Sequence, residues 1–422
     1  MSWAVEELQE IDLGDERLNK RTHRLVEDLF ENASSSIPTA CGGWAETQAA
    51  YRYFSNEKVD WEKILEAHIE KSTERMGQHE VVLCLQDTTE LDFTGQAIEG
   101  MGRLSYDKQR GMYLHPTLMV TPERESLGVT DLWMWARGPS KAEDQQRRTM
   151  CESTRWVEGY ERVAELAEQV PQTRLVYVAD RESDIAALMG RAAALGQPAD
   201  WLLRSCRDRK VDGEDDKLWE GFEADHEMGQ LRFRLASRHS QGEREVEQTL
   251  SVRRCRVNTP EGRVDLTAIL AREEHPPEGV KPIEWRLLTN RRVETFEQAT
   301  EMIRWYRARW EIEQFFFVLK TGCEVEKLQL SAIERIERAL ALYVLVAWRV
   351  LRVMRLGRVC PKLSCEVFFS PDEWRAAYLV ARKALPKEPP SLNDVLRVVA
   401  SFGGFLGRRG DGEPGTKSLW IG

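Results

Sequence analysis

The chain contains 422 residues, and its 60 Lys and Arg against 70 Asp and Glu give a formal net charge of −10 at pH 7. The length allows two or three domains with a large buried core, whereas the negative charge argues against indiscriminate binding to polyanions. The sequence shows no apolar run long enough to cross a membrane and no signal peptide, and its eight cysteines are scattered. These features predict reduced thiols in a cytoplasm of bacterial type.

The N-terminal part of the chain, residues 1–68, predicts a compact helical module. Residues 13–33 have the apolar spacing of one amphipathic helix. Residues 44–56 have the spacing of a shorter helix that ends at a turn. We therefore expect a small helical domain before the first strand.

Residues 69–350 predict an α/β catalytic core. Three strand patterns within residues 81–137 are followed by a helix, a strand, a helix and a strand, over 143–170, 174–180, 185–195 and 200–205. This order, with acidic residues at strand ends, matches an RNase H-like core. Residues 206–284 have a period near two, which predicts a β-rich insertion in the core. Residues 351–422 predict a helical C-terminal region that ends in a glycine-rich stretch.

Two aspartates each close a buried strand pattern. Asp87 ends the run VVLCLQD, and Asp180 ends the run RLVYVAD directly before a helix. With a glutamate from a later helix they could hold two Mg²⁺ ions, since this cation prefers oxygen ligands and two such ions serve phosphoryl transfer. The alternatives are that Asp87 caps a turn and that Asp180 is the N-cap of the next helix.

The segment 305–320 predicts a helix with an unusual polar side. At about 100° per residue, sequence offsets of 3, 7 and 14 place four residues within roughly 60°: Tyr306, Arg309, Glu313 and Lys320. The opposite side is apolar and carries Trp305, Ile312, Phe315 and Leu319. A tyrosine and two cations around a carboxylate predict a phosphate clamp beside a metal ligand. The alternative is an ordinary amphipathic helix with one Arg–Glu pair.

Positive charge is concentrated around this helix. Residues 286–358 hold fourteen Lys and Arg against nine Asp and Glu. A basic region on an acidic protein is typical of a selective DNA enzyme. The alternative, which applies to many of these arginines, is a pair of solvated helices with salt bridges.

Several motifs in the same order along most of the chain resemble one known family. They are LGDERLNKR, AAYRYFSN, DTT at Asp87, RGMYLHP, DRESDI at Asp180, LLRS, WRLLT, YRARWEIE, LKTG, GGF and a final Trp–Gly pair. Together they resemble the bacterial cut-and-paste DDE transposases with the signature Y-x2-R-x3-E-x6-K, the group that includes the Tn-five transposase and its insertion-sequence relatives. The resemblance implies a DNA transposase that cleaves element ends through a hairpin intermediate and joins the 3′ ends to target DNA.

The resemblance also implies roles for individual residues. Asp87, Asp180 and Glu313 would bind two Mg²⁺ ions, with Mn²⁺ as a substitute. The DNA contacts would come from Tyr306, Arg309, Lys320, Trp310, Trp285, Arg204, Arg17 and Arg21. Among these, Trp310 would stack on a base flipped out of the hairpin and Trp285 would fill the vacated space, although fourteen tryptophans make a core role a real alternative for both. His115 could touch the metal site, but a lone His in a strand is more often a satisfied core residue.

The sequence departs from the family pattern at a few positions. Leu18 replaces a basic residue of the recognition helix, and Phe316 and Phe317 replace polar or basic groups. We therefore expect a different preference for the end sequence. The chain also stops soon after GGF, without the family's long C-terminal helix, which puts the usual dimer contact in doubt. The expected partner is double-stranded DNA, both inverted repeats and target, with a monomer when free and a homodimer on DNA in the nucleoid of the cytoplasm.

Two other functions agree with parts of the sequence. Another RNase H-like nuclease, such as a junction resolvase, needs the carboxylates but not the clamp or the two tryptophans. A non-catalytic repressor derived from a transposase would not need the metal-binding carboxylates, yet Asp87, Asp180 and Glu313 are all present.

Overall fold

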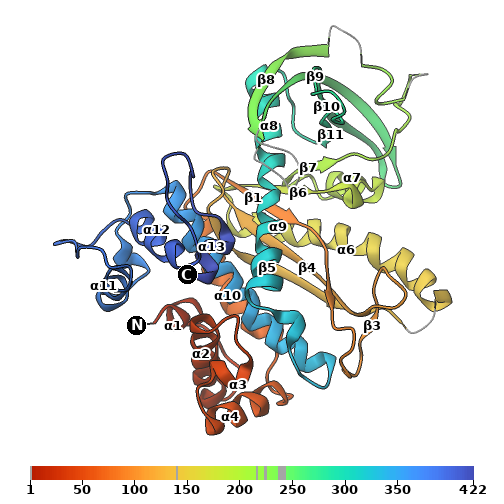
Figure 1. Cartoon of the computed structure of the whole chain (residues 1–422). Coiled ribbons are helices and arrows are strands. Elements are labelled where there is room, and N and C mark those ends of the chain that lie inside the picture. The colour runs from red at the N-terminus through yellow and green to blue at the C-terminus, as the bar shows by residue number, and fades with distance from the viewer. Residues whose placement is uncertain (1, 139–140, 215–216, 223–225, 236–243) are drawn as a thin grey trace. The chain divides into compact units, whose positions relative to one another are not determined.

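The computed structural model describes residues 2–138, 141–214, 217–222, 226–235 and 244–422, with only the backbone described for 141–153. The chain divides into two compact units (Figure 1). The first unit contains Met1–Met76, Thr88–Asp144 and Trp310–Gly422, and the second contains Gly77–Asp87 and Gln145–Arg309. The three-domain division expected from the sequence stays a prediction.

The first unit begins with five helices. They are α1 (Trp3–Glu7), α2 (Glu16–Glu31), α3 (Ile37–Ala40), α4 (Trp44–Phe54) and α5 (Trp61–Met76). The helix α2 begins where the Asp15 side chain accepts a hydrogen bond from the Arg17 backbone N–H, and it buries Leu25, Val26 and Leu29. The two helices predicted in this region are confirmed.

A buried polar network ties α1 to α5. The fully buried His68 on α5 contacts a Glu7 carboxylate oxygen through Nδ1 at 2.5 Å, and its Nε2 accepts the Val129 backbone N–H at 3.0 Å. Arg75 donates two further hydrogen bonds to Glu7. Because Nε2 accepts, the proton of the neutral ring lies on Nδ1 and is donated to Glu7. Burial lowers the pKa of His68, which keeps this neutral form.

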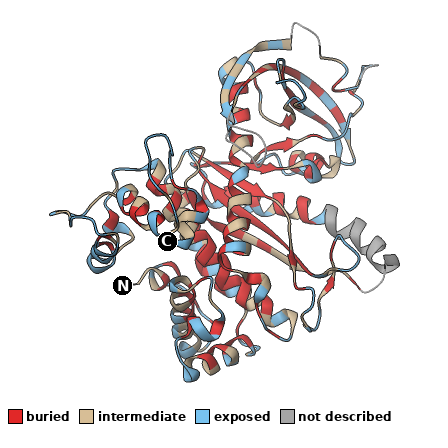
Figure 2. Ribbon diagram, viewed as in Figure 1, coloured by how far each residue is buried: buried red, intermediate tan, exposed pale blue. Residues whose placement is uncertain are grey.

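Four antiparallel strands and a long helix form the rest of the first unit's core. The strands are β2 (Thr89–Asp92), β3 (Gly102–Arg103), β4 (Arg110–Val120) and β5 (Ser126–Trp135), and β4 pairs with each of the others. The helix α10 (Ile333–Val359) packs on α5 and β5. It is buried at every residue from Ala339 to Trp348 (Figure 2), so it is a central helix of this unit.

The C-terminal region is helical, as predicted. It contains η5 (Cys365–Val367), α11 (Pro371–Val380), α12 (Leu392–Phe402) and α13 (Thr416–Ile421). Their small core is formed by Cys365, Trp374, Tyr378, Val395 and Val398. The helix α11 begins with a capping box between Ser370 and Glu373.

The second unit is built on one mixed sheet. Its strands, in spatial order, are β1 (Val81–Gln86), β6 (Arg174–Ala179), β7 (Asp200–Arg204), β11 (Glu284–Thr289), β10 (Gly262–Glu273), β9 (Arg244–Thr259) and β8 (Glu227–Leu235). The first three strands are parallel, and each later pair is antiparallel. The predicted β-rich segment therefore extends the sheet of the parallel strands through β11 instead of forming a sheet of its own.

Helices accompany this sheet. They are α6 (Lys141–Gln169), η1 (Arg181–Ser183), α7 (Ala186–Ala194) and α8 (Phe296–Ala308). The helix α6 lies close to one face, because a Cβ on Gly159 would be 2.3 Å from the amide nitrogen of Gln86. Gln86 is buried on that face and accepts a hydrogen bond from the Tyr177 hydroxyl at 2.8 Å. The fold is thus mixed α/β, with the expected alternation of strands and helices.

The single helix predicted over 305–320 is wrong in its details. The helix α8 ends at Ala308 and α9 (Trp310–Phe317) begins after Arg309, where the chain passes from the second unit to the first. Residues Val318–Gly322 (η3) then form a π-helical turn. A π turn has more residues per turn than an α-helix, so the arc calculated for an ideal α-helix does not extend to Lys320. The apolar side is confirmed, since Trp305 is 3% exposed and Ile312, Phe315 and Leu319 are fully buried.

Among the described residues, no helix combines the length and the apolar character that crossing a membrane requires.

Candidate active site and nucleic-acid contacts

The second unit brings three predicted site residues to one edge of its parallel strands. Gln86 on β1 pairs in register with Ala179 on β6, and Ala179 pairs with Leu203 on β7. Asp87 and Asp180 are the first residues after β1 and β6, and Arg204 is the last residue of β7. Adjacent strands lie about 4.8 Å apart, so these three residues are near neighbours at the carboxyl edge. All three are partly exposed there.

The side chains at this edge point away from α6. Residues in register on parallel strands share a face, and successive residues alternate between faces. Because Gln86 faces α6, the residues that follow it and its register partners lie on the other face. The strand patterns are buried up to the last residue, so the two aspartates are the first polar groups that reach the open edge.

Asp180 also has the local role that was the alternative to metal binding. Its Oδ1 accepts the Glu182 backbone N–H at 2.9 Å and so caps η1. A cap uses acceptor capacity on one oxygen, whereas a carboxylate has about four lone-pair sites. Capping and metal binding are therefore compatible at this residue.

Asp87 pairs with an arginine predicted for the phosphate clamp. The Arg309 guanidinium contacts Asp87 Oδ2 at 2.5 Å, and the two side chains are 12% and 16% exposed. This pairing places positive charge where a bound cation would otherwise balance the carboxylate. Asp87 and Asp180 carry oxygen donors of the kind that Mg²⁺ prefers. Within the described parts of the chain, no three Asp, Glu, His or Cys side chains are grouped closely enough to hold a metal by themselves.

The remaining predicted residues around Glu313 lie in the first unit. Glu313 is half-buried on α9, and Trp310 at the start of that helix is 43% exposed. Lys320, on the π turn, donates to the Glu90 carbonyl at 2.8 Å and pairs with Glu326 at 3.1 Å. Lys320 is thus held by protein groups here, and the convergence of Glu313 with the two aspartates stays a prediction.

Trp285 and Tyr306 belong to an aromatic cluster in the second unit. Trp285 on β11 stacks on Phe233, with ring centroids 5.7 Å apart, and meets the Tyr306 ring edge-on at 6.2 Å. Tyr306 is only 5% exposed. The Arg307 guanidinium lies over Phe233 at 4.1 Å. Trp285 is partly buried in these contacts, so a packing role is present alongside any role with DNA.

The two N-terminal arginines differ in exposure. The Arg17 side chain is 90% exposed and pairs with the capping residue Asp15. Arg21 is 27% exposed and forms an ion pair with Glu46 of α4. Arg17 can reach a ligand without breaking a helix–helix contact, whereas Arg21 would first have to exchange its ion pair with Glu46.

His115 is a satisfied core residue with respect to its surroundings. It is fully buried on β4, and its Nδ1 hydrogen-bonds to the Thr88 hydroxyl at 2.9 Å. Thr88 directly follows Asp87 in the sequence.

The sequence pattern did not predict a second, buried carboxylate two residues before Glu313. Glu311 is fully buried on α9 and pairs with Arg355 at 2.5 Å and with Arg124 at 3.6 Å. Burial raises the pKa of Glu311, and these two arginines oppose that rise. The sequence held one signal: Glu311 falls next to Phe315 on the apolar side of the helical wheel.

Several arginines of the basic stretch have structural roles. On α10, Arg352 donates to the Ser126 carbonyl, Arg355 pairs with Glu311, and Arg358 donates to the Pro414 carbonyl. Burial lowers the pKa of Arg349 to about 10. For these residues the interpretation as a DNA-facing basic region is wrong, because their guanidinium groups are mostly buried against protein.

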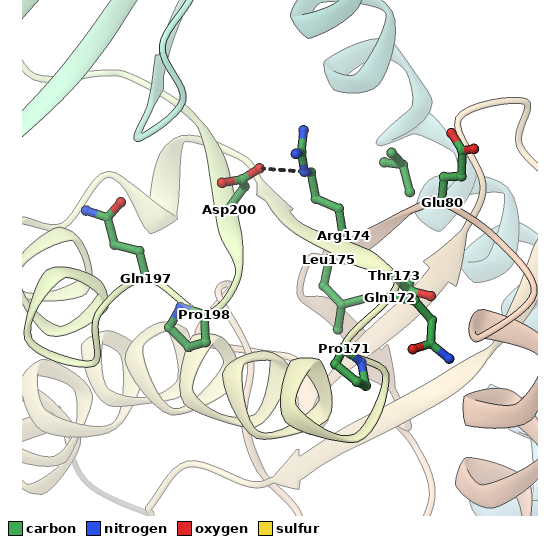
Figure 3. Close-up of a pocket in the computed structure, with 10 residues that line it drawn as sticks. Glu80, Pro171, Gln172, Thr173, Arg174, Leu175, Gln197, Pro198 and Asp200 are labelled. Atoms are coloured by element: carbon green, nitrogen blue, oxygen red, sulfur yellow. Dashed lines mark ion pairs between the residues drawn. The ribbon is translucent and has the colours of Figure 1, made fainter.

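An open polar pocket lies at the other end of the same parallel strands (Figure 3). It is lined by residues that begin β1, β6 and β7, including Glu80, Arg174 and Asp200. Arg174 and Asp200 point toward each other and form an ion pair at 3.8 Å. The pocket therefore lies at the amino ends of the strands, away from the edge with the two predicted ligands.

Two family models match the chain, and both describe transposases. Residues 1–59 match the transposase DNA-binding model, and residues 345–422 match the model of the transposase Tn5 dimerisation domain. These matches confirm the resemblance to the Tn5 group of transposases at both ends of the chain.

Among solved structures, the chain is similar to a piggyBac transposase in a synaptic complex with hairpin DNA. The identity is 9% and the TM-score is 0.38, and the likeness covers 81% of this chain and 64% of that chain. The chain thus spans less than two thirds of that structure.

The match at the C-terminal end bears on the expected oligomer. The sequence analysis put the family's dimer contact in doubt because of the short segment after GGF. Residues 345–422 nevertheless match a dimerisation domain, which removes that doubt about the region. Whether the free protein is a monomer stays a prediction.

Proposed function

We propose that this protein is a metal-dependent DNA transposase that binds the ends of a mobile element, cleaves them through a hairpin intermediate and joins the 3′ ends to target DNA. The proposal rests on one observation above all. Asp87 and Asp180 directly follow two adjacent parallel strands whose last residues pair in register, in a chain whose two ends match transposase domains. We assign the catalytic core to the RNase H-like type on the same basis.

In this proposal Asp87, Asp180 and Glu313 hold two Mg²⁺ ions, for which Mn²⁺ can substitute. When bound, such ions polarise the phosphoryl oxygens and supply a nucleophile at neutral pH. Asp180 is already oriented by its cap to Glu182, so its position does not depend on the ligand. Asp87 is oriented by Arg309.

The cationic residues position DNA. Once a bound cation balances the charge of the Asp87 carboxylate, Arg309 releases Asp87 and binds a DNA phosphate. Lys320 likewise releases Glu326 and binds a phosphate. Arg204 contacts the backbone from beside Asp180, and Arg17 with Arg21 reads the element end. These contacts bring phosphates to the strand edge and fix the register of the duplex.

The aromatic residues hold an unpaired base. A hairpin requires an unstacked nucleotide, and an aromatic face stabilises one. Trp310 is 43% exposed at the start of α9 and can offer its face, while Tyr306 and Trp285 stay in their cluster and border the vacated space. The protein would act as a homodimer on DNA in the bacterial nucleoid, and as a monomer when free.

A cleavage assay on the inverted repeats that flank the gene tests the proposal. With Mg²⁺ the wild-type protein should nick and then hairpin these ends, and Glu313→Gln should bind them without nicking, because it loses a metal ligand and no positive charge. Binding without cleavage by the wild type would indicate a repressor. Cleavage of four-way junctions in preference to ends would indicate a junction resolvase.

A further inference from the structure

The last helix, α13, is bonded to the helix that carries Glu313. The Thr416 hydroxyl donates to Oε1 of Gln314 at 2.8 Å, and Gln314 directly follows Glu313 on α9. Thr416 is 8% exposed and also lies 3.3 Å from the sulfur of Met354 on α10. A hydroxyl in this position cannot exchange its partner for water without moving a helix.

The same helix packs against the π turn that carries Lys320. A Cβ on Gly322 would lie 3.0 Å from two ring atoms of Trp420, so the indole touches the backbone of the turn. A side chain at this position would require the Trp420 ring to shift by a few tenths of an ångström. The glycine of the LKTG motif therefore has a packing partner in α13.

Two more glycines hold α13 itself. A Cβ on Gly403 would lie 2.0 Å from the Ser418 carbonyl oxygen, and a Cβ on Gly422 would lie 1.8 Å from the Val399 carbonyl oxygen. The backbones of α12 and α13 thus meet directly. The GGF motif and the final Trp–Gly pair have no proposed role in the reaction. They belong to one packed group that contacts α9 through Thr416 and η3 through Trp420.

A buried ion pair near the start of α9 also holds this helix. Glu311 cannot leave Arg355 without exposing an unpaired charge to a site that is fully buried. This pair sets the rotation of α9 about its axis, while Thr416 and Trp420 set the position of its C-terminal half and of the π turn. Rotation and position together determine where the Glu313 carboxylate and the Lys320 ammonium point.

We propose that α13 is a positioning element of the active site: Thr416 and Trp420 hold α9 and η3 in the geometry that cleavage requires. This inference rests on the proposed function of Glu313 and Lys320. A displacement of about 1 Å in a reacting group can cost about 10²-fold in rate. Loss of the α13 contacts should therefore lower the rate of cleavage more than the affinity for end DNA, since Lys320 is one of several proposed phosphate contacts whereas cleavage depends on the geometry of Glu313.

The first test compares two substitutions of one residue. Thr416→Val keeps the shape of the side chain but removes the hydroxyl, whereas Thr416→Ser keeps the hydroxyl. In single-turnover nicking of end DNA, the valine variant should be about tenfold slower with a smaller change in Kd, and the serine variant should be close to wild type. Lys417→Ala, an exposed change on the same helix, is the matched control.

A second measurement does not depend on activity. Hydrogen exchange of the amides in residues 310–322 should be faster in Thr416→Val than in Thr416→Ser, with unchanged exchange in the central helix α10. Faster exchange throughout the first unit would mean that the change destabilises the whole unit, which would overturn a specific role for this contact.

A third test uses suppression. Gly322→Ala should slow nicking, because its Cβ displaces the Trp420 ring, and the double variant Gly322→Ala with Trp420→Leu should recover part of the rate by making room. Normal nicking by Thr416→Val and Gly322→Ala would overturn the inference while leaving the proposed function intact. Absence of cleavage by the wild type would instead remove the proposed function itself.

Discussion

Two pairs of neighbouring carboxylates, one in each unit, divide in the same way. In the second unit Asp180 lies at the open strand edge, and Asp184, four residues later, is 1% exposed and pairs with Arg209 at 2.5 Å. In the first unit Glu313 is half-buried, while Glu311 is fully buried between arginines. One member of each pair is buried in an ion pair with arginine, whereas the other is partly exposed to solvent.

The buried member holds the element that presents the accessible one. Asp184 is the C-cap of η1, whose N-cap is Asp180, and it accepts the backbone N–H groups of Cys206 and Arg207, so it ties η1 to the loop that follows Arg204. Glu311 fixes α9 in the same sense. Charge alone therefore does not distinguish the two members of a pair, whereas burial and the number of protein donors do.

The largest expected effect separates activity from stability at Asp180. Asp180→Asn keeps an acceptor for the Glu182 N–H but loses a metal ligand, so cleavage of end DNA should fall more than about 10³-fold. The free energy of unfolding should change by less than about 0.5 kcal/mol. Urea unfolding and single-turnover cleavage, measured on one preparation, check both. Substantial residual cleavage would assign the ligand role elsewhere.

The second effect is the reverse of the first and falls on Asp184. Asp184→Ala leaves Arg209 without its buried partner and frees two backbone donors, so it should cost about 3–5 kcal/mol of stability. Binding and cleavage should be lost only in proportion to unfolding, which urea titrations monitored by circular dichroism can establish. A stable but inactive Asp184→Ala would place this residue among the ligands and break the comparison.

A third prediction concerns the buried network of His68, Glu7 and Arg75 in the first unit. The folded-state pKa of His68 lies below its ordinary value of 6.5, so the unfolded chain binds a proton that the native state does not. Stability should therefore be present above pH 6.5 and be lost as the pH falls, with a slope approaching about 1.4 kcal/mol per pH unit. Burial raises the pKa of Glu7, but His68 and Arg75 lower it by more, so it lies below its ordinary value of 4.5. Protonation of Glu7 therefore reduces stability further only below pH 4.5. Urea unfolding between pH 7.5 and 5 measures the first part, and a gain in stability over this range would mean that native His68 is protonated.

The smallest expected effect extends the comparison to α2. Arg17→Ala removes an exposed cation, so it should reduce the salt dependence of end binding by about one phosphate contact with unchanged stability. Arg21→Ala breaks the pair with Glu46 and should also lower the melting temperature of the N-terminal module. Electrophoretic binding at several salt concentrations and thermal unfolding separate the two. Equal behaviour of both variants would argue against a distinct role for the exposed arginine.

Local patterns predicted the parts of this molecule that local physics determines. The strands before Asp87 and Asp180 are apolar runs that stop at a charge, and each ends one residue before its predicted end. The break at Arg309 and the π turn at Lys320 were missed, because both depend on neighbours distant in sequence, such as Trp420 behind Gly322. The partners of Asp87, Glu311 and Lys320 were missed for the same reason, since each is supplied by another part of the chain.

The interleaving of the two units has a consequence for synthesis on the ribosome. The second unit needs only residues 77–309 and can be completed while the last quarter of the chain is still being made. The first unit cannot, because its N-terminal helices wait for α10, whose Arg338 donates to the carbonyls of Phe54 and Val59. The usual order, in which the N-terminal domain folds first, is thus inverted here. The helices that match a DNA-binding domain are translated first but reach their final packing last, so a nascent chain cannot present a finished DNA-binding surface before its C-terminal region has emerged.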